Sequence, residues 1–447
     1  MRSRPVGSVA SSFVLIPRPI LTELADALDA IDDGLRLATV EVDIDPLDLV
    51  RAGHEAFGFS AFFASPEGRS VGALGTAQVL ATSGPDRLRR LDTAVAELPV
   101  DAPIVAGFAF ASDGPTGTAW EGFPGATAVV PIITVRRSGG RSRLTIAVPP
   151  GSDGRMLLSA ASTLRVPGPV GDVVASDPVI ESRPGPSDWT ETVAEAVGAI
   201  GAGALQKVVL ARSVVMRTTE PVEPFDVVSH LRDRYPSCRV FGWQVDGGTF
   251  VGASPELLVA RSGDHFHLSP LAGSAPRGVD ADDDRRLGDE LLASSKDRVE
   301  HDIVVEDAVR RLRPLAETVD FPSEPQLQRF ATVQHLATPI QGSSGSRTLV
   351  LADALHPTPA VGGAPRSDAL AFIDKREGLD RGWYAGGIGW LEAGGDGELA
   401  LGLRCALLRG DTALLYAGNG IVAASDPEAE LAETRLKLRT LLDLFQG

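Results

Sequence analysis

Two kinds of segment alternate along the chain. Short apolar runs are bounded by turn residues, and longer segments have apolar residues at helical spacing. In the segment LQKVVLARSVV, residues 205–215, neither face of an extended chain is cleanly polar, which is typical of a strand buried on both sides. This run and similar ones predict strands at 205–216, 238–245, 248–252, 256–261, 265–269, 384–392, 398–407 and 412–418. Helical spacing predicts helices at 17–31, 223–233, 284–314, 348–355, 366–378 and 427–445.

The order of these elements predicts an α+β fold. Strands joined as hairpins and interrupted by helices differ from the regular alternation of a parallel βαβ array. In the first part of the chain, segments 125–137 and 142–150 are predicted to pair across a Gly-rich turn. Residues 181–200 begin as a linker and continue as a helix, with Ser187 or Asp188 as the expected cap. We therefore place a boundary near residue 185.

The N-terminal segment MRSRPVGSVASSFVLIP has two arginines before a mildly apolar stretch. This arrangement is compatible with a poor signal peptide or with a first strand. Serines interrupt the apolar stretch, so we favour the strand. Because no apolar run reaches the roughly 18–20 residues of a membrane span, we expect no association with a membrane.

The composition of the 447-residue chain disfavours several classes of function. The formal net charge of −17 disfavours nucleic acid as a partner, because such a surface repels phosphate backbones. Two cysteines are too few for a disulfide framework, so we expect a reducing, cytoplasmic location. Neither G-x-G-x-x-G after a strand nor G-x-x-x-x-G-K-[ST] occurs, so nucleotide binding has no support. An anionic small molecule remains possible if a pocket is locally positive.

Lys207 is the first polar residue that needs an explanation, because it lies inside the strand predicted to be buried. One interpretation is a buried lysine that pairs with a carboxylate or extends to the strand end. The other is a general base, because desolvation or a neighbouring cation lowers the pKa of a lysine from its usual 10.4 or so. Both interpretations stay open at this point.

Glu256, in GASPELLVAR, follows a tight turn and opens an apolar strand. Against such a wall a carboxyl group tends to have a raised pKa and to keep its proton at neutral pH. The alternative is a glutamate that faces the solvent at a strand end. Glu256 is thus a candidate general acid.

Two predicted helices carry carboxylates that are candidates for binding a metal ion. Glu300 lies beside the apolar stripe of the helix within 284–314, and Glu430, Glu433 and Lys437 share one face of the C-terminal helix. These residues are either charged helix faces with ordinary ion pairs or, where the helices meet, a Mg²⁺ site. Mg²⁺ takes few protein oxygens and keeps several waters, which leaves room for a substrate carboxylate.

Two Gly-rich segments, PLAGSAPRG (270–278) and YAGNGIV (416–422), are predicted loops whose backbone N–H groups can approach a ligand closely. Arg404 lies in LGLRCALL, on a predicted strand of apolar or small residues. A buried arginine needs an anion, either from the protein or from a ligand. Each of these signals is weak by itself.

Taken together and in order, these segments resemble the chorismate-utilising enzymes. The resemblance covers roughly residues 190–447, through the motifs KVVLAR, GASPELL, PLAGSAPRG, KDRVEHDIVV, VQHLATPIQG, LHPTPAVGGAPR, WYAGGIGW, LGLRCA, LYAGNGIVAASDPEAELAET and KL. Within that family, the lysine of KVVLAR and the stretch LHPTPAVGG look like isochorismate synthase. The first 185 or so residues match the family only loosely.

The resemblance implies a single large α+β domain in which two antiparallel sheets pack together, with helices around them and the site in a cleft between them. Residues 1–185 would then be a divergent part that contributes strands to the same body. Residues 186–447 would be the chorismate-binding catalytic region. The boundary near 185 becomes a boundary between motifs.

The resemblance also implies a role for each residue. Lys207 would activate water and Glu256 would protonate the departing hydroxyl. Glu300 and Glu433 would hold Mg²⁺, with Glu430 nearby and acting through water. The residues implied to bind the substrate are Arg404 and Tyr384 for the enolpyruvyl carboxylate, Gly273, Ser274, Gly418 and Lys437 for the ring carboxylate and its metal, and His335 and Ala360 along the ring.

The implied reaction is the Mg²⁺-dependent isomerisation of chorismate to isochorismate, in which water adds at ring carbon 2 and the hydroxyl leaves carbon 4. The product would feed menaquinone or siderophore biosynthesis. Alternatives are salicylate synthase, which would go on to eliminate pyruvate, anthranilate or aminodeoxychorismate synthase, and a catalytically silent chorismate-binding protein. Neither cysteine lies in the context of a glutaminase nucleophile, so we expect no obligatory glutaminase subunit, and we expect a monomer.

Overall fold

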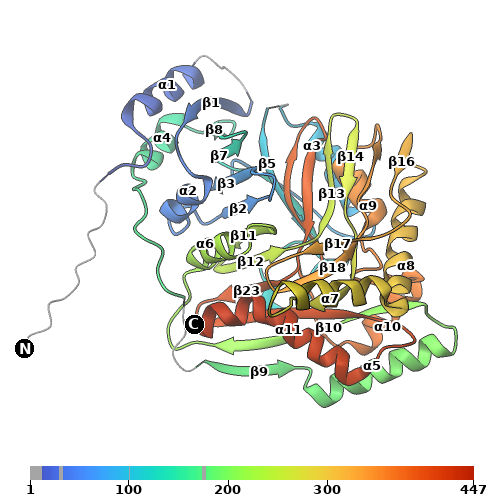
Figure 1. The fold of residues 1–447 in the computed structure, drawn as a ribbon. Coiled ribbons are helices and arrows are strands. Elements are labelled where there is room, and N and C mark those ends of the chain that lie inside the picture. Colours follow the sequence, from blue (N-terminus) through green and yellow to red (C-terminus); the bar gives the residue numbers. More distant parts are fainter. Residues whose placement is uncertain (1–12, 30–33, 100, 174–177, 447) are drawn as a thin grey trace, which may run out of the picture.

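The computed structural model describes residues 13–29, 34–99, 101–173 and 178–446. Its strands form two large antiparallel sheets, with helices around them, and a small third sheet (Figure 1). The predicted α+β class, a single domain with two antiparallel sheets and surrounding helices, is confirmed. The third sheet was not predicted, and it consists of β15 (Leu271–Pro276), β18 (Val333–Ala337) and β17 (Gln326–Arg329).

The larger sheet contains 12 strands among the described residues. Along the sheet these are β1 (Arg36–Val42), β8 (Arg141–Val148), β7 (Ile133–Ser138), β3 (Ser70–Leu74), β2 (Ser60–Ala64), β11 (Arg239–Val245), β12 (Gly248–Ser254), β23 (Cys405–Arg409), β24 (Thr412–Ile421), β10 (Lys207–Arg217) and β20 (Gly363–Ala364), with β9 (Val179–Arg183) also paired to β10. Strands from distant parts of the chain are therefore neighbours in this sheet, for example β2 and β11.

The second sheet has nine strands within the described ranges. In spatial order these are β16 (Thr318–Asp320), β19 (Ile340–Ser343), β14 (His265–Leu268), β13 (Leu257–Ser262), β22 (Gly397–Leu401), β21 (Gly387–Glu392), β5 (Pro103–Phe108), β6 (Ala126–Val130) and β4 (Gln78–Thr82). Here too an early strand, β5, pairs with a late one, β21.

The helices surround the sheets: α11 packs on β24, α8 on β15 and α10 on β10 (Figure 1). Their bounds are α1 (Arg18–Asp29), α2 (Pro46–Gly53), α3 (Arg87–Ala96), α4 (Gly154–Ser162), α5 (Pro186–Gly201), α6 (Pro224–Arg234), α7 (Ala281–Ala293), α8 (Ser295–Leu312), α9 (Thr348–Leu355), α10 (Arg366–Arg376) and α11 (Pro427–Gln446). In the part of the chain that the structure describes, no helix has the length and apolar character needed to cross a membrane.

Two predicted features of the helices are wrong. The single helix predicted over 284–314 is two helices, because Ser294 has extended backbone and its hydroxyl caps α8 by accepting from the Asp297 N–H. The helix α5 begins at Pro186 with Gly185 as its N-cap, rather than with Ser187 or Asp188. Proline is tolerated there because the first-turn N–H groups have no partner within the helix.

Two predicted strands are each divided between the sheets. The run 125–137 breaks near Pro131, which has no N–H for a ladder, so β6 joins the second sheet and β7 joins the larger one. The run 398–407 breaks between β22 and β23, which also lie in different sheets. Arg404, predicted to be on a strand, lies in this connection with a left-handed φ of +48°.

Both Gly-rich segments predicted as loops lie mostly in strands. Residues 271–276 form β15, where Gly273 has φ of +71° at a shift in the register with β18. The segment 416–421 continues β24 and pairs with β10 as far as Ile421. The predicted first strand falls largely on residues 1–12, outside the described residues, and Val14 makes an isolated bridge with Arg165.

Candidate active site

The buried strand β10 positions the lysine that the sequence singled out. Each residue from Lys207 to Met216 is buried, so the predicted burial on both faces is confirmed. Lys207 opens the strand and is only 1% exposed. It lines a cavity of about 100 Å³.

The structure brings every predicted site residue to this one cavity. The residues named by the sequence analysis that line it are Lys207, Glu256, Gly273, Ser274, Glu300, His335, Ala360, Tyr384, Arg404, Gly418, Glu430, Glu433 and Lys437. They come from β10, β15, β18, β24, α8, α11 and the connections between strands. We call this space the active cavity.

Lys207 both lines the active cavity and pairs with a carboxylate. Its Nζ lies 3.0 Å from Oε1 of Glu300, on α8. Gly420 of β24 packs against this pair, because a Cβ there would meet the Glu300 carboxylate and lie 2.6 Å from Lys207 Cε. Glu300 is thus the counter-charge of this buried lysine.

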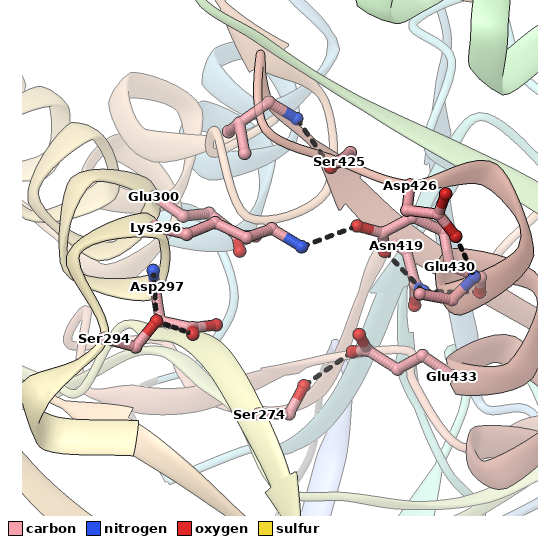
Figure 2. A network of polar contacts seen from close by, with 12 residues as sticks. Ser274, Ser294, Lys296, Asp297, Glu300, Asn419, Ser425, Asp426, Glu430 and Glu433 are labelled. Atoms are coloured by element: carbon pink, nitrogen blue, oxygen red, sulfur yellow. Dashed lines mark hydrogen bonds and ion pairs between the residues drawn. The ribbon is translucent and has the colours of Figure 1, made fainter. Parts of the chain in front are cut away.

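A second ion pair spans the active cavity between α8 and α11. Lys296 Nζ lies 2.9 Å from Glu430 Oε1, and the Asn419 amide donates to the other Glu430 oxygen at 3.0 Å (Figure 2). Glu430 is only 2% exposed, and both of its side-chain oxygens have a partner. The sequence analysis did not single out Lys296 or Asn419.

Glu433 forms the third pair. It accepts from the Ser274 hydroxyl at 2.6 Å (Figure 2), and Lys437 Nζ lies 2.8 Å away one helical turn along α11. Burial alone would raise the pKa of Glu433, but Lys437 and the two hydrogen bonds lower it to about 2. We call the three pairs, Lys207–Glu300, Lys296–Glu430 and Lys437–Glu433, the ion-paired wall.

The ion-paired wall fits a Mg²⁺ ion that keeps water ligands. Its donors are carboxylate oxygens, which this hard cation prefers. Among the described residues, oxygens of Glu300, Glu430 and Glu433 do not gather within 4.8 Å of one another. That spacing suits one or two direct carboxylate ligands, with the rest of the shell filled by water and substrate. Asp297, which the sequence analysis missed, adds another carboxylate to this lining.

Glu256, which lies between β12 and β13, contrasts with the glutamates of the ion-paired wall. The residue is 5% exposed, which contradicts the solvent-facing alternative. Burial raises the pKa of Glu256 to about 8, and Lys207 and Lys437 lower it only in part. At neutral pH the carboxyl group therefore carries a proton. We call this part of the lining, Glu256 with Pro255 and Leu271, the apolar wall.

Arg404 supplies a cation without an acidic partner. In the described part of the chain no carboxylate lies within 4.0 Å of its guanidinium, and Nη2 lies 3.5 Å from His335 Nε2. The His335 Nδ1–H donates to the Gly273 carbonyl at 3.1 Å, and burial lowers the pKa of His335 to about 3, so the ring is neutral. Tyr384 stacks on Tyr416 beside this group, with ring centroids 5.3 Å apart.

Comparison with protein families decides the affiliation of the chain. A model of chorismate binding enzymes matches residues 32–446. The chain belongs to the chorismate binding enzyme family. The match includes most of the divergent first part as well as the region that carries the motifs.

Individual relatives of this chorismate binding enzyme agree with that assignment. It is 38% identical to the salicylate biosynthesis isochorismate synthase of Pseudomonas aeruginosa, over 95% of this chain and 92% of that protein. It is 35% identical to the isochorismate synthase MenF of Bacillus subtilis, over 77% and 74% of the two chains. The structure of the menaquinone-specific isochorismate synthase MenF of Escherichia coli superposes with a TM-score of 0.83, at 27% identity, covering 96% of this chain and all of that one.

One structural unit behind the active cavity escaped the sequence analysis. On one edge β10 pairs with β20 at residues 207–208 and with β9 from residue 213, which leaves a gap between them. The ion pair of Glu377 and Arg381 fills it: Glu377 accepts from the Ala211 N–H, and Arg381 donates to Val209 O, each at 2.8 Å.

The same ion pair holds the loop that carries Ala360. Arg381 also donates to the Val361 carbonyl at 2.8 Å, and Val361 lines the active cavity of this chorismate binding enzyme. Both members are almost fully buried, at 3% and 2% side-chain exposure. The only signal in the sequence is a glutamate and an arginine four residues apart in REGLDRGWY, which is common on exposed helices.

Proposed function

We propose that this chorismate binding enzyme converts chorismate to isochorismate with Mg²⁺ as cofactor, and that the product supplies menaquinone or siderophore biosynthesis. The observation that carries the proposal is one cavity that holds a buried, protonated Glu256, the amine of Lys207 and an arginine without an acidic partner. The names of the relatives support the same reaction.

Binding of the substrate depends on local cations in a protein of net charge −17. Arg404, beside Tyr384, would receive the enolpyruvyl carboxylate, because a buried guanidinium without a carboxylate partner favours an anion. The ring carboxylate would lie toward the ion-paired wall, near Gly273, Ser274 and Gly418. His335 and Ala360 would line the ring, and the neutral imidazole leaves Arg404 its full charge toward the ligand.

Each wall of the active cavity would supply one of the two groups that transfer protons. Lys207 would accept a proton from water as the water oxygen bonds to ring carbon 2. Glu256 would give its proton to the hydroxyl on carbon 4, which leaves as water. One proton is taken up and one is released, so atoms and charge balance across the isomerisation. General acid–base groups of this kind contribute about 10²- to 10⁴-fold each in rate.

Glu300 and Glu433 would hold the Mg²⁺, with Glu430 acting through water. The ion would orient the ring carboxylate and draw electrons from the conjugated system. Glu300 would then contact both the metal and Lys207, which would keep the amine beside the metal-bound substrate.

The direct test is to incubate the purified protein with chorismate and Mg²⁺ and to separate the products by liquid chromatography. We expect isochorismate without pyruvate. Pyruvate formed together with fluorescent salicylate would instead identify a salicylate synthase. Saturable chorismate binding with no change in the substrate would leave only the catalytically silent protein.

A further inference from the structure

A second cavity lies behind the loop that lines the active cavity. We call it the rear cavity; it has a volume of about 980 Å³ and shares no lining residue with the active cavity. His356 and Pro357, at the start of the loop, line the rear cavity, whereas Ala360 and Val361 line the active one. One short segment thus contributes to the lining of both spaces.

The rear cavity contains two arginines whose charges the protein does not balance directly. Arg87, the first residue of α3, is 5% exposed and donates from Nη2 to the Ala109 carbonyl at 2.8 Å. Arg366, the first residue of α10, donates from Nη2 to the Leu355 carbonyl at 2.5 Å. Within the described ranges neither guanidinium has a carboxylate within 4.0 Å, and the Nε of each lacks an acceptor.

The carboxylates that line the rear cavity are mostly engaged with other groups. Asp353 pairs with Arg89 at 2.8 Å and also acts on Arg87 and Arg366 from beyond 4.0 Å, and Glu377 pairs with Arg381. Asp380 accepts from the backbone N–H groups of residues 116 and 117. Asp374 is exposed on α10. Since burial also lowers the pKa of both Arg87 and Arg366 to about 10, a ligand anion would relieve a real cost of keeping them charged.

The remaining lining defines the body of the ligand. It includes an apolar part, which comes from Leu88, Phe110, Leu370, Ile373 and Leu379. His356 adds no charge, because burial, together with Arg87 and Arg366, lowers its pKa to about 3. A site with an apolar lining and a few placed cations is suited to a small organic acid rather than to a bare inorganic ion.

We propose that the rear cavity binds a small organic carboxylate with an apolar ring, and that Arg87 and Arg366 hold its carboxylate. Planar guanidinium groups match a carboxylate in two-point hydrogen bonding, and each arginine has donors to spare beyond its backbone contacts. The site does not depend on the proposed reaction, because its residues take no part in the active cavity.

Calorimetric titration of the full chain with benzoate tests this proposal. We expect saturable binding of benzoate, and binding of the neutral analogue benzyl alcohol at least about tenfold weaker, because it cannot accept charge-assisted hydrogen bonds. Replacing Arg366→Gln should weaken benzoate binding by roughly ten- to a hundredfold. The matched control is Arg376→Gln on the same helix, which removes only an exposed pair with Glu195 and should leave the affinity unchanged.

Two further measurements show which of the two cavities binds benzoate. Arg404→Gln, in the active cavity, should leave the Arg366-dependent part of benzoate binding unchanged, and inorganic phosphate should compete poorly for that part. If benzoate binding is lost in Arg404→Gln but kept in Arg366→Gln, the acid binds in the active cavity and the proposal is overturned. Phosphate that binds as tightly as benzoate would contradict the assigned ligand class. Because Arg87 is buried and its replacement endangers folding, the test uses Arg366.

Discussion

The ion-paired wall and the apolar wall each carry a glutamate, and the two glutamates differ in protonation within one cavity. Burial raises the pKa of Glu256 to about 8, whereas Glu433, beside Lys437 and the Ser274 hydroxyl, has a pKa of about 2. Both glutamates line the active cavity, but the Glu433 side chain is 30% exposed and Glu256 is 5% exposed. Burial and the cation in direct contact therefore act together.

This difference divides the chemistry of the site. A carboxyl group that keeps its proton can act as an acid, and one that stays ionised can bind a cation. Lys207 belongs structurally to the ion-paired wall but is assigned the task of a base. Its role therefore depends on what Glu300 contacts when substrate and metal are bound.

The largest expected effect comes from removing the metal that we place at the ion-paired wall. Chelation with EDTA should abolish isochorismate formation, and added Mg²⁺ should restore it. Titration of the apoprotein with Mg²⁺ should show weaker binding for Glu433→Gln, because one carboxylate ligand is lost. Full turnover in EDTA would leave the three carboxylates with a structural role only.

Replacing the lysine of the ion-paired wall tests whether it does more than balance charge. Lys207→Ala should lower kcat by about 10²- to 10⁴-fold, because the attacking water loses its base. Steady-state kinetics on chorismate measures the effect, and circular dichroism verifies the fold. Lys375→Ala, on α10 and outside the active cavity, is the control. Undiminished turnover in Lys207→Ala would make the lysine purely structural.

Glu377 sharpens the comparison, since it is buried like Glu256 but paired with a cation. Glu377→Ala leaves Arg381 buried without its counter-charge and should lower the free energy of unfolding by about 3–5 kcal/mol. Denaturant unfolding measures this change. The exposed pair of Arg376 and Glu195 offers the control, because Glu195→Ala should cost only about 0–1 kcal/mol. Equal losses in the two variants would contradict the assigned importance of the buried pair.

The smallest effect is expected from pH, and it reports on the apolar wall. Glu256 must be protonated to donate, and its pKa is raised to about 8, so kcat/KM should fall as pH rises through about 8. The fall should be about tenfold for each further pH unit, since one pKa unit is a factor of ten. In Glu256→Gln this limb should vanish from a much lower profile. A limb that persists in the variant would belong to another group.

The chemistry-bearing residues of the active cavity were predictable, and so was pairing of Lys207 with a carboxylate and of Lys437 within its own helix, whereas the contacts of Glu430 were not. Lys207 and Glu256 are recognisable because a charged residue in an apolar strand breaks the local pattern. Lys296 and Asn419 lie in segments rich in polar residues, so no local pattern singles out their contacts with Glu430. The Glu377–Arg381 pair has the spacing of an ordinary helix-surface pair and becomes unusual only when buried.

Strand positions were predicted better than sheet membership for a related reason. Apolar runs mark 125–137 and 398–407 as extended, but pairing with distant strands decides that each run divides between two sheets. The break at Pro131 has a local cause in the missing N–H. The break at Arg404 has no comparable signal, because arginine does not favour a φ of +48°.

The pairing of β5 with β21 has a consequence for synthesis of the chain. The partner of β5 leaves the ribosome about 280 residues later, since the two strands span residues 103–108 and 387–392. At about 5–20 residues per second, β5 waits roughly 15–55 seconds with that edge unpaired. A chaperone that shields nascent strand edges should therefore raise the yield of this protein more than that of a chain whose strands pair with near neighbours.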